Sequence, residues 1–465
     1  DEHRLPSQPI DYKGASTVAE ILIASCPPIG HVAPLLNVAR GLVRRGHDVT
    51  FLTSARHADT VQATGAVPQP LPYGADYDDA SFDADLPGRA ETSGVARVNF
   101  DVKHVFVRPL PHQAAALDEL MKAKHFDAIL TDAFFLGILP MLLGDRASRP
   151  PVLTYSTTPL FLSSRDTAPG GTGILPGTGA LGRLRNRALN TAAQKILLRA
   201  SHQAADTMLS ALGLPKLPVF VLDSAILADR LIVPTIPEFE YHRGDLPAHV
   251  RFVGAVSPPP TDGFVAPPWW HELSADRPVV HVTQGTIDNA DLGRLIEPTL
   301  EALADEDVTV VVTTGGRPVS QIRGPLPTNA FVAEFIPHDV LLPSVDVMVT
   351  NGGYGAVQRA LMTGVPLVVA GNTEDKPEVA ARVEWFGAGV NLRTGVPTAA
   401  MVRRAVHQVL EDDAYRTAAR TLQRAYALRD GVADIADLVD EVIAERAVAA
   451  VREPDRDRVR ASTRC

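Results

Sequence analysis

Short apolar runs alternate with amphipathic stretches through the first half of the chain. Residues 20–25 and 49–53 have the mostly apolar character of strands that a sheet buries on both faces. Between them, residues 32–45 carry apolar side chains at helical spacing, and further short runs follow at 128–131 and 152–155. Strands that alternate with helices in this way predict a doubly wound parallel sheet.

The same alternation restarts after a proline-rich break. Residues 257–263 read Ser-Pro-Pro-Pro-Thr-Asp-Gly, and such proline density excludes regular structure. Beyond the break, strand candidates separated by helical patterns lie at 279–283, 308–313, 330–335, 345–349 and 365–370. Two α/β domains joined by a linker make a cleft, which is a favoured place for a ligand.

The domain boundaries follow from these breaks. We predict a disordered segment at 1–14, a first α/β domain at 15–256, a proline-rich linker at 257–268, a second α/β domain at 269–430, a helix at 431–451 and a disordered charged tail at 452–465.

Composition narrows the classes of function. With 465 residues the chain exceeds one ordinary core, and its net charge of −10 argues against nucleic acid as a partner. No apolar run reaches the length of a membrane span, and the start of the chain has no hydrophobic signal-peptide core. The only cysteines are Cys26 and Cys465, which does not suggest a disulfide framework. We therefore expect a cytoplasmic protein, as a monomer or homodimer.

A glycine-rich segment is the most informative motif. Gly352, Gly353 and Gly355 lie between the strand candidate at 345–349 and a helical pattern that Gly364 ends. Backbone N–H groups and the positive end of a helix dipole converge at such a junction, which suits a phosphate. The alternative is a tight turn whose glycines only avoid steric conflict. The pattern is neither a nucleoside-triphosphate loop nor a dinucleotide fingerprint, so an ATPase or dehydrogenase is not predicted.

His31 is the candidate for proton transfer. It follows the strand candidate at 20–25 and begins a helix, whose dipole favours a neutral ring that can accept a proton. Asp132 follows the strand candidate at 128–131, so it belongs at the same sheet edge and could orient the imidazole. The alternatives are a capping or surface histidine and a helix N-cap aspartate.

Metal and hydrolase patterns are missing from the sequence. There are no paired cysteines, no His-Glu-x-x-His, and the adjacent pair Asp78-Asp79 has no intervening residue. No Gly-x-Ser-x-Gly elbow is present either. We therefore expect chemistry that uses neither a metal nor another cofactor.

Taken together, these segments resemble the bacterial branch of the UDP-glycosyltransferase superfamily, of the macrolide-glycosyltransferase type. The resemblance rests on residues 30–36 and 45–53 at the start and on residues 351–376 in the second half. It implies the GT-B fold, in which two Rossmann-like domains face a central cleft and a C-terminal helix packs back on the first domain. It also implies that His31 is the general base, held by Asp132, in a single-step inverting transfer of a sugar from a nucleotide diphosphate.

The resemblance further implies residues that bind the donor, a UDP- or TDP-sugar. They are Gly285 and Thr286 near the phosphates, Phe335, Ile336 and His338 at the base, Asn351, Gly353, Gly355 and Ala356 in the phosphate loop, Gln358 beside the ribose, and Asp375 and Lys376 at the sugar. Several positions depart from the family pattern. Asn351 stands where a histidine is usual, Lys376 where a glutamine is usual, and Arg359 where a ribose-binding glutamate is usual.

The acceptor is expected in the first domain. We predict contacts from Ile29, Phe82, Phe100, Phe134 and Tyr155, with more apolar material from Phe106, Phe135, Phe161 and Leu162. An apolar small molecule with a hydroxyl fits, such as a macrolide, another polyketide antibiotic or a phenolic compound. The alternatives are a nucleotide-sugar epimerase of the same fold and a non-catalytic member that only binds a nucleotide sugar.

Overall fold

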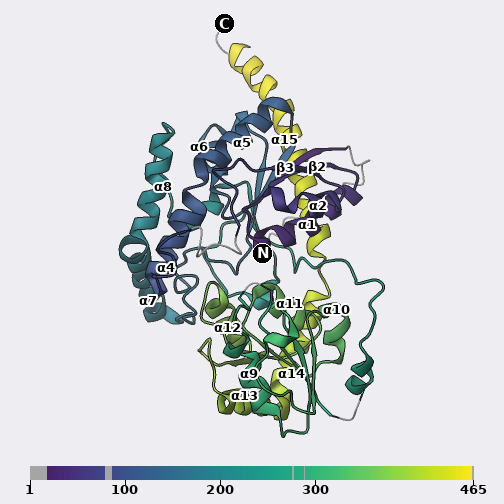
Figure 1. The fold of residues 1–465 in the computed structure, drawn as a ribbon. Coiled ribbons are helices and arrows are strands. Elements are labelled where there is room, and N and C mark those ends of the chain that lie inside the picture. Colours follow the sequence, from purple (N-terminus) through teal and green to yellow (C-terminus); the bar gives the residue numbers. More distant parts are fainter. Residues whose placement is uncertain (1–17, 79–85, 275–276, 287, 463–465) are drawn as a thin grey trace, which may run out of the picture.

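The computed structural model describes residues 18–78, 86–274, 277–286 and 288–462 (Figure 1). The predicted disordered segment at 1–14 and the predicted acceptor residue Phe82 lie outside the described residues. Two parallel sheets, each flanked by helices, form a first and a second unit, so the predicted α/β class is confirmed.

The first unit is built on a seven-stranded parallel sheet of order β3-β2-β1-β4-β5-β6-β7. The chain runs outward from β1 to β3 and then returns to pair β4 against β1. The neighbouring strands β1 and β4 therefore mark the switch point where open α/β sheets hold ligands. The strands are β1 Glu20–Ala24, β2 Asp48–Thr53, β3 Val67–Pro70, β4 Ala128–Asp132, β5 Val152–Tyr155, β6 Arg230–Val233 and β7 Val250–Phe252.

Helices cover both faces of this sheet. The apolar face of α1 is buried against the sheet. Helix α4 continues into a short π-helical turn at Val102–Val107, and α8 follows another at Ala193–Leu197. The helices are α1 Ile29–Arg44, α2 Ala58–Gln62, α4 Gly94–Asp101, α5 Leu110–Ala123, α6 Leu139–Leu143, α7 Gly179–Ala192 and α8 Arg199–Ala211.

The second unit repeats the design with six parallel strands of order β10-β9-β8-β11-β12-β13. Its switch point lies between β8 and β11. The strands are β8 Val279–Thr283, β9 Thr309–Thr313, β10 Ala330–Ala333, β11 Val347–Thr350, β12 Leu367–Val369 and β13 Gly389–Asn391. The helices are α9 Ile296–Leu303, α10 His338–Leu341, α11 Tyr354–Met362, α12 Lys376–Trp385, α13 Ala399–Glu411 and α14 Asp413–Tyr426.

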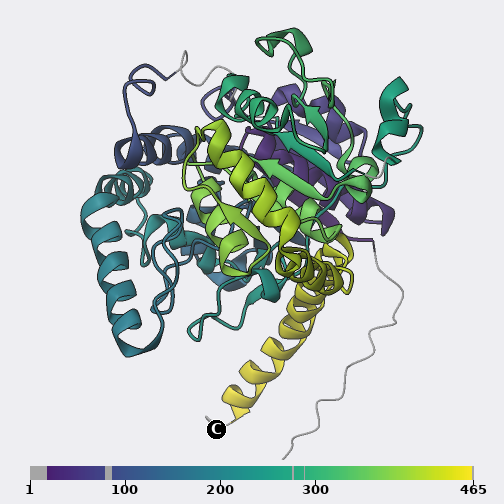
Figure 2. The same ribbon diagram turned by 90° about the horizontal axis from the view of Figure 1, so that it is seen from below.

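The last helix, α15 Gly431–Ser462, leaves the second unit beside α14 and packs on the first (Figures 1 and 2). Its apolar residues Ile435, Val439 and Val442 join the core beneath α1. This return to the first unit was predicted from the family resemblance. The helix extends through positions 452–462, which we predicted to be disordered.

The chain crosses between the units twice, at residues 254–267 and 427–430, and the two crossing segments touch. A Cβ atom on Gly254 would lie 2.6 Å from Cβ of Arg429, and one on Gly431 would lie 2.5 Å from the carbonyl oxygen of Ala255. Only glycine allows this close approach at both positions. Among the described residues, no helix combines the length and apolar character needed to cross a membrane.

Candidate active site

A histidine and an aspartate meet at the switch point of the first sheet. His31 lies in the first turn of α1, directly after β1, and Asp132 is the last residue of the neighbouring strand β4. The distance from His31 Nδ1 to Asp132 Oδ1 is 3.0 Å. The His31 side chain is 15% exposed, whereas the Asp132 side chain is fully buried. The structure thus brings together the two residues that the sequence suggested for proton transfer.

Backbone hydrogen bonds fix the Asp132 carboxylate. The N–H of Phe134 donates to Oδ1 at 2.7 Å, and the N–H of Cys26 donates to Oδ2 at 2.9 Å. Burial acts to raise the pKa of Asp132, but the positive charge of a protonated His31 and these hydrogen bonds outweigh it and lower the pKa below its ordinary value. Asp132 is therefore charged and oriented toward the imidazole, and no α-helix begins at this residue for it to cap.

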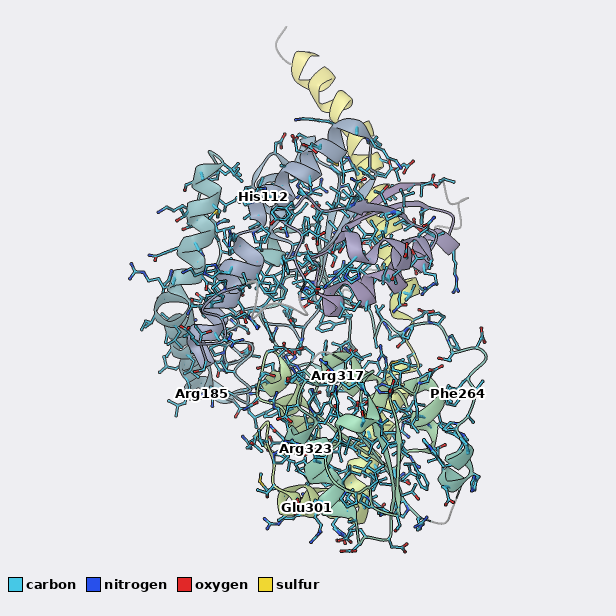
Figure 3. The ribbon with its side chains drawn as sticks, viewed as in Figure 1. His112, Arg185, Phe264, Glu301, Arg317 and Arg323 are labelled. Atoms are coloured by element: carbon cyan, nitrogen blue, oxygen red, sulfur yellow. The ribbon has the colours of Figure 1, made fainter. Side chains whose placement is uncertain are left out.

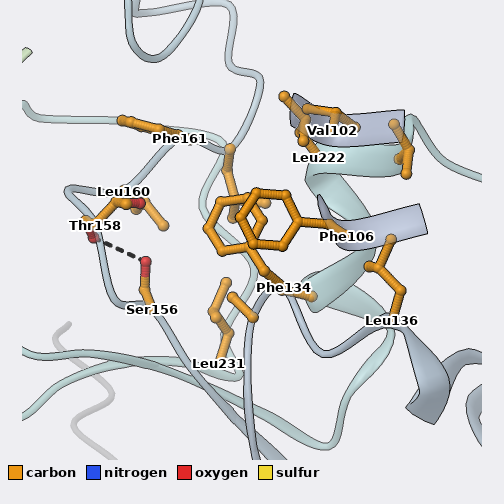
Figure 4. Close-up of a pocket in the computed structure, with 14 residues that line it drawn as sticks. Val102, Phe106, Phe134, Leu136, Ser156, Thr158, Leu160, Phe161, Leu222 and Leu231 are labelled. Carbon is orange, nitrogen blue, oxygen red and sulfur yellow. Dashed lines mark hydrogen bonds between the residues drawn. The ribbon is translucent and has the colours of Figure 1, made fainter. Parts of the chain in front are cut away.

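Aromatic rings pack around the imidazole and lead into an apolar cavity. The ring centroid of His31 lies 5.7 Å from that of Phe106 and 5.6 Å from that of Phe134. Both phenylalanines line an apolar pocket that is partly open to solvent, and the empty space of about 500 Å³ at this pocket includes some of that solvent (Figure 4). The other lining residues are Val102, Ala133, Leu136, Ser156, Thr158, Leu160, Phe161, Leu162, Val221, Leu222, Ala225 and Leu231.

Only some of the residues predicted to contact the acceptor line this cavity. Phe134, Phe106, Phe161 and Leu162 line the cavity. Of the remaining predictions, Tyr155 and Phe135 are buried in core clusters, Phe100 packs against His104, and Ile29 is 37% exposed at the start of α1. The aliphatic part of the wall, from Val221, Leu222 and Ala225, could not be predicted, because this short helical segment carries no distinguishing sequence pattern.

The second unit presents its own switch point to the first. Loops after β8, β9 and β11 lie at the carboxyl ends of the strands, and Arg317, which follows β9, lies at the edge that faces the first unit (Figure 3). Gly353 is the N-cap of α11, and no side chain caps this helix. A Cβ atom on Gly355 would meet no atom within 4 Å, so open space adjoins the first turn of α11.

Asn351 and Gly285, two of the residues predicted to contact the phosphates, make hydrogen bonds within and between the loops of the second unit. The side-chain N–H of Asn351 donates to the carbonyl oxygen of Gln284 at 2.5 Å, so it joins the β11 loop to the β8 loop. Gly285, in the β8 loop, has a φ of 72°, and its N–H donates to Thr283 Oγ1 at 3.2 Å. The neighbouring Thr286 is exposed and Ala356 is half-buried. Asn351 therefore holds the β8 and β11 loops together. The uncapped N–H groups at the start of α11 are the groups most directly able to donate hydrogen bonds to an anion there.

The residues predicted for base and ribose differ in exposure. Phe335 is 64% exposed, whereas Ile336 is buried in the core. Burial and the nearby Arg359 lower the pKa of His338 to about 4, so this ring is neutral near neutral pH. Gln358 is buried, and its Oε1 has no hydrogen-bond partner among the described residues. An unpaired buried acceptor of this kind favours a ligand that brings a donor.

The predicted sugar-binding pair lies at the start of α12. Burial raises the pKa of Asp375 to about 6, against the lowering effects of Lys376 and, from the first unit, of His31. Asp375 and His31 therefore lie within electrostatic reach across the gap between the units. The Lys376 ammonium is buried, 3.4 Å from Asp288 Oδ2, and it also pairs with Glu374. The positive charge of Lys376 is thus neutralised locally by two carboxylates.

The described ranges contain no group of three or more His, Cys, Asp or Glu side chains that could hold a metal ion.

Comparisons with known proteins agree over most of the chain. Residues 297–442 match the family model described as Erythromycin biosynthesis protein CIII-like, C-terminal domain. The chain is 42% identical to 4'-demethylrebeccamycin synthase of Lentzea aerocolonigenes over 427 residues, covering 91% of this chain and 100% of the relative. It is 36% identical to UDP-glycosyltransferase 2 of Phaeomoniella chlamydospora, over 91% of this chain and 96% of that one.

Solved structures share the fold. The calicheamicin glycosyltransferase CalG4 superposes with a TM-score of 0.67 at 25% identity, covering 92% of this chain and 99% of that chain. The glycotransferase of kitacinnamycin superposes with a TM-score of 0.68 at 24% identity, over 91% and 99% respectively.

Proposed function

Since this chain belongs to the UDP-glycosyltransferase superfamily and has antibiotic glycosyltransferases of GT-B fold among its relatives, we propose that it transfers a sugar in one inverting displacement, with His31 as general base. The observation that carries this proposal is the pair formed by His31 and Asp132, 3.0 Å apart at the edge of the first unit that faces the second.

The pair suits proton removal from a hydroxyl. With Nδ1 of His31 toward Asp132, the neutral tautomer carries its proton on Nδ1 and its lone pair on Nε2. Nε2 takes the proton of the acceptor hydroxyl as the oxygen attacks the anomeric carbon of the donor sugar. The charged Asp132 stabilises the imidazolium that forms, and the nucleotide diphosphate leaves from the opposite face.

The donor fits the second unit. The N–H groups at the start of α11, around Gly353 and Gly355, would stabilise the leaving diphosphate without a metal ion. The exposed ring of Phe335 is available to stack on the base, and the unpaired Oε1 of Gln358 can accept from a ribose hydroxyl. Asp375 would accept hydrogen bonds from the sugar hydroxyls. The nucleotide is UDP or TDP.

The acceptor fits the apolar cavity of the first unit. Its walls are phenylalanine and aliphatic side chains, with Ser156 and Thr158 among the few polar ones, and it adjoins the His31 ring. An apolar small molecule with one reactive hydroxyl, such as a macrolide, another polyketide antibiotic or a phenolic compound, matches that lining.

A mass-spectrometric screen tests the proposal. UDP-glucose, TDP-glucose and other nucleotide sugars are each incubated with a panel that includes macrolide aglycones, aromatic polyketides and 4-methylumbelliferone. We expect a product heavier by one sugar residue, with inverted anomeric configuration by NMR. In His31→Ala, kcat should fall by about 10²–10⁴-fold, while UDP binding is kept. The proposal fails if no acceptor gains a sugar, or if His31→Ala turns over normally.

A further inference from the structure

Four buried charged side chains lie where the two units meet, away from the reacting atoms. Arg382 of α12 is fully buried, and it donates to Glu240 of the first unit from Nη2 at 2.6 Å and from Nε at 3.3 Å. Its Nη1 donates to Glu378 of its own helix at 2.7 Å. Arg243 lies 3.6 Å from Glu240, so two guanidinium groups balance two carboxylates.

The group reaches the wall of the apolar cavity on one side. The N–H of Leu160 donates to Glu240 Oε2 at 3.4 Å, and Nη2 of Arg243 donates to the carbonyl oxygen of Leu160 at 2.6 Å. Leu160 lines the cavity. The charged group therefore holds both backbone polar atoms of a residue in the wall.

On its other side the group reaches the donor corner. The N–H of Glu378 donates to the carbonyl oxygen of Asp375 at 3.0 Å, within the first turn of α12. Oε2 of Glu378 accepts from the N–H of Gly173, in the loop of the first unit that precedes α7, at 3.0 Å. The start of α12, which carries Asp375 and Lys376, is thus tied to the first unit through both Arg382 and Gly173.

We propose that the chain Glu240–Arg382–Glu378 is a positioning device that holds the sugar-binding carboxylate of Asp375 in register with the acceptor cavity. This inference rests on the proposed function. Three buried side chains with two-pronged hydrogen bonds define the spacing between α12 and the cavity wall more narrowly than one ion pair can. An acceptor that presses on the wall near Leu160 would shift the same chain, so acceptor and donor binding become coupled reciprocally.

Arg382→Lys tests the positioning role. Lysine keeps the charge but replaces the planar fork with a single ammonium group, which cannot hold Glu240 and Glu378 in one plane. With the donor and acceptor that give most product in the screen above, we expect kcat to fall and the donor KM to rise, each by about 10-fold. The dependence of donor KM on acceptor concentration should disappear. The Kd of UDP alone, which lacks the sugar, should stay at the wild-type value.

Arg149→Lys is the matched control. Arg149 pairs with Asp229 at 2.7 Å, is also buried, and lies wholly within the first unit. It should lower the melting temperature without changing KM, kcat or the coupling. If Arg382→Lys does not fold, Glu378→Gln is the substitute variant. Glutamine keeps an oxygen that can accept from the N–H of Gly173, but it removes the negative charge that pairs with Arg382.

The outcomes separate the two ideas. An active wild type with unchanged kinetics in Arg382→Lys, or in its substitute, contradicts the positioning role alone. Equal kinetic losses in Arg382→Lys and Arg149→Lys also contradict it, because they would reflect general destabilisation. A wild type that transfers no sugar contradicts the proposed function and this inference with it.

Discussion

At the scale of single residues, the site depends on charges that burial would penalise if they stood alone. Asp132 stays ionised because two backbone N–H groups and His31 surround it, and Lys376 is buried only in company with Asp288 and Glu374. Asp375 differs from these two residues, because its partners do not offset the effect of burial, which raises its pKa to about 6. Each of these groups has a charge state that a substitution or a change of pH can alter.

Asp132→Asn should reduce turnover while leaving the donor in place. The amide keeps the size of the side chain but no longer stabilises an imidazolium, so kcat should fall by about 10²–10⁴-fold. Steady-state kinetics and UDP binding by calorimetry measure the two effects. A wild-type kcat in the folded variant would show that Asp132 does not orient His31.

The Asp375 carboxyl predicts a pH dependence of donor binding. Its pKa of about 6 means that it becomes protonated as the pH falls through that value and then loses its capacity as a charged acceptor. The donor KM should therefore rise below pH 6 and level off above it. Asp375→Asn should have a higher KM that no longer changes across this range. UDP, which has no sugar, is the control ligand, and a KM that is flat in the wild type would contradict the assignment.

The sequence predicted that His31 and Asp132 lie together, but not the partners of every residue proposed to bind the donor. His31 and Asp132 follow strands, and the carboxyl ends of neighbouring parallel strands meet at one edge. The sequence does not reveal that Asn351 bonds to Gln284 or that Lys376 pairs with Asp288, since these contacts join loops far apart in the chain. It also does not show that Tyr155 faces the core, because β5 is buried on both faces.

At the scale of elements, the interior strands with continuous apolar runs were predicted, whereas three of the four edge strands were not. The predicted runs at 20–25, 128–131 and 279–283 are strands, because continuous apolar residues suit a sheet covered on both faces. The strands β3, β7 and β13 lie at sheet edges and were not predicted, and β3 contains two prolines. β6 is central but offers only three apolar residues.

In α11, the substitution Gly355→Ala should keep or raise the stability of the protein but lower its affinity for UDP. Gly355→Ala meets no neighbouring atom, and alanine favours a helix by about 0.5–1 kcal/mol over glycine, so urea denaturation should show a protein that is as stable or more so. A methyl group there would occupy the space proposed for the diphosphate, so UDP affinity should fall by about 10-fold or more. Unchanged UDP binding in the stable variant would place the phosphates elsewhere.

At the scale of the whole molecule, the first unit depends on the end of the chain. The fully buried Ile435 of α15 packs in the core beneath α1, and Arg45 pairs with Asp437 at 2.6 Å and with Asp440 at 2.9 Å. The core of the first unit is therefore not complete without residues from the far end of the chain. Family resemblance predicted this return, whereas the periodicity of residues 433–451 alone indicated only a helix.

Ile435→Ala should cost about 2–5 kcal/mol of unfolding free energy, since it leaves a cavity in the core. Urea denaturation followed by circular dichroism measures the loss. Val448→Ala, on the same helix at a 47% exposed position, should cost almost nothing. Similar values for the two variants would contradict the packing of α15 on the first unit.

The touching crossings at Gly254 and Gly431 have a mechanical consequence. Two connections that touch at one place leave the two units fewer directions of relative movement than one connection would. Under the proposed function, any closure of the two units would bring the donor sugar toward His31 along a restricted path. Larger side chains at these two glycines would collide with the neighbouring crossing segment, so they should impair such a closure without contacting either substrate.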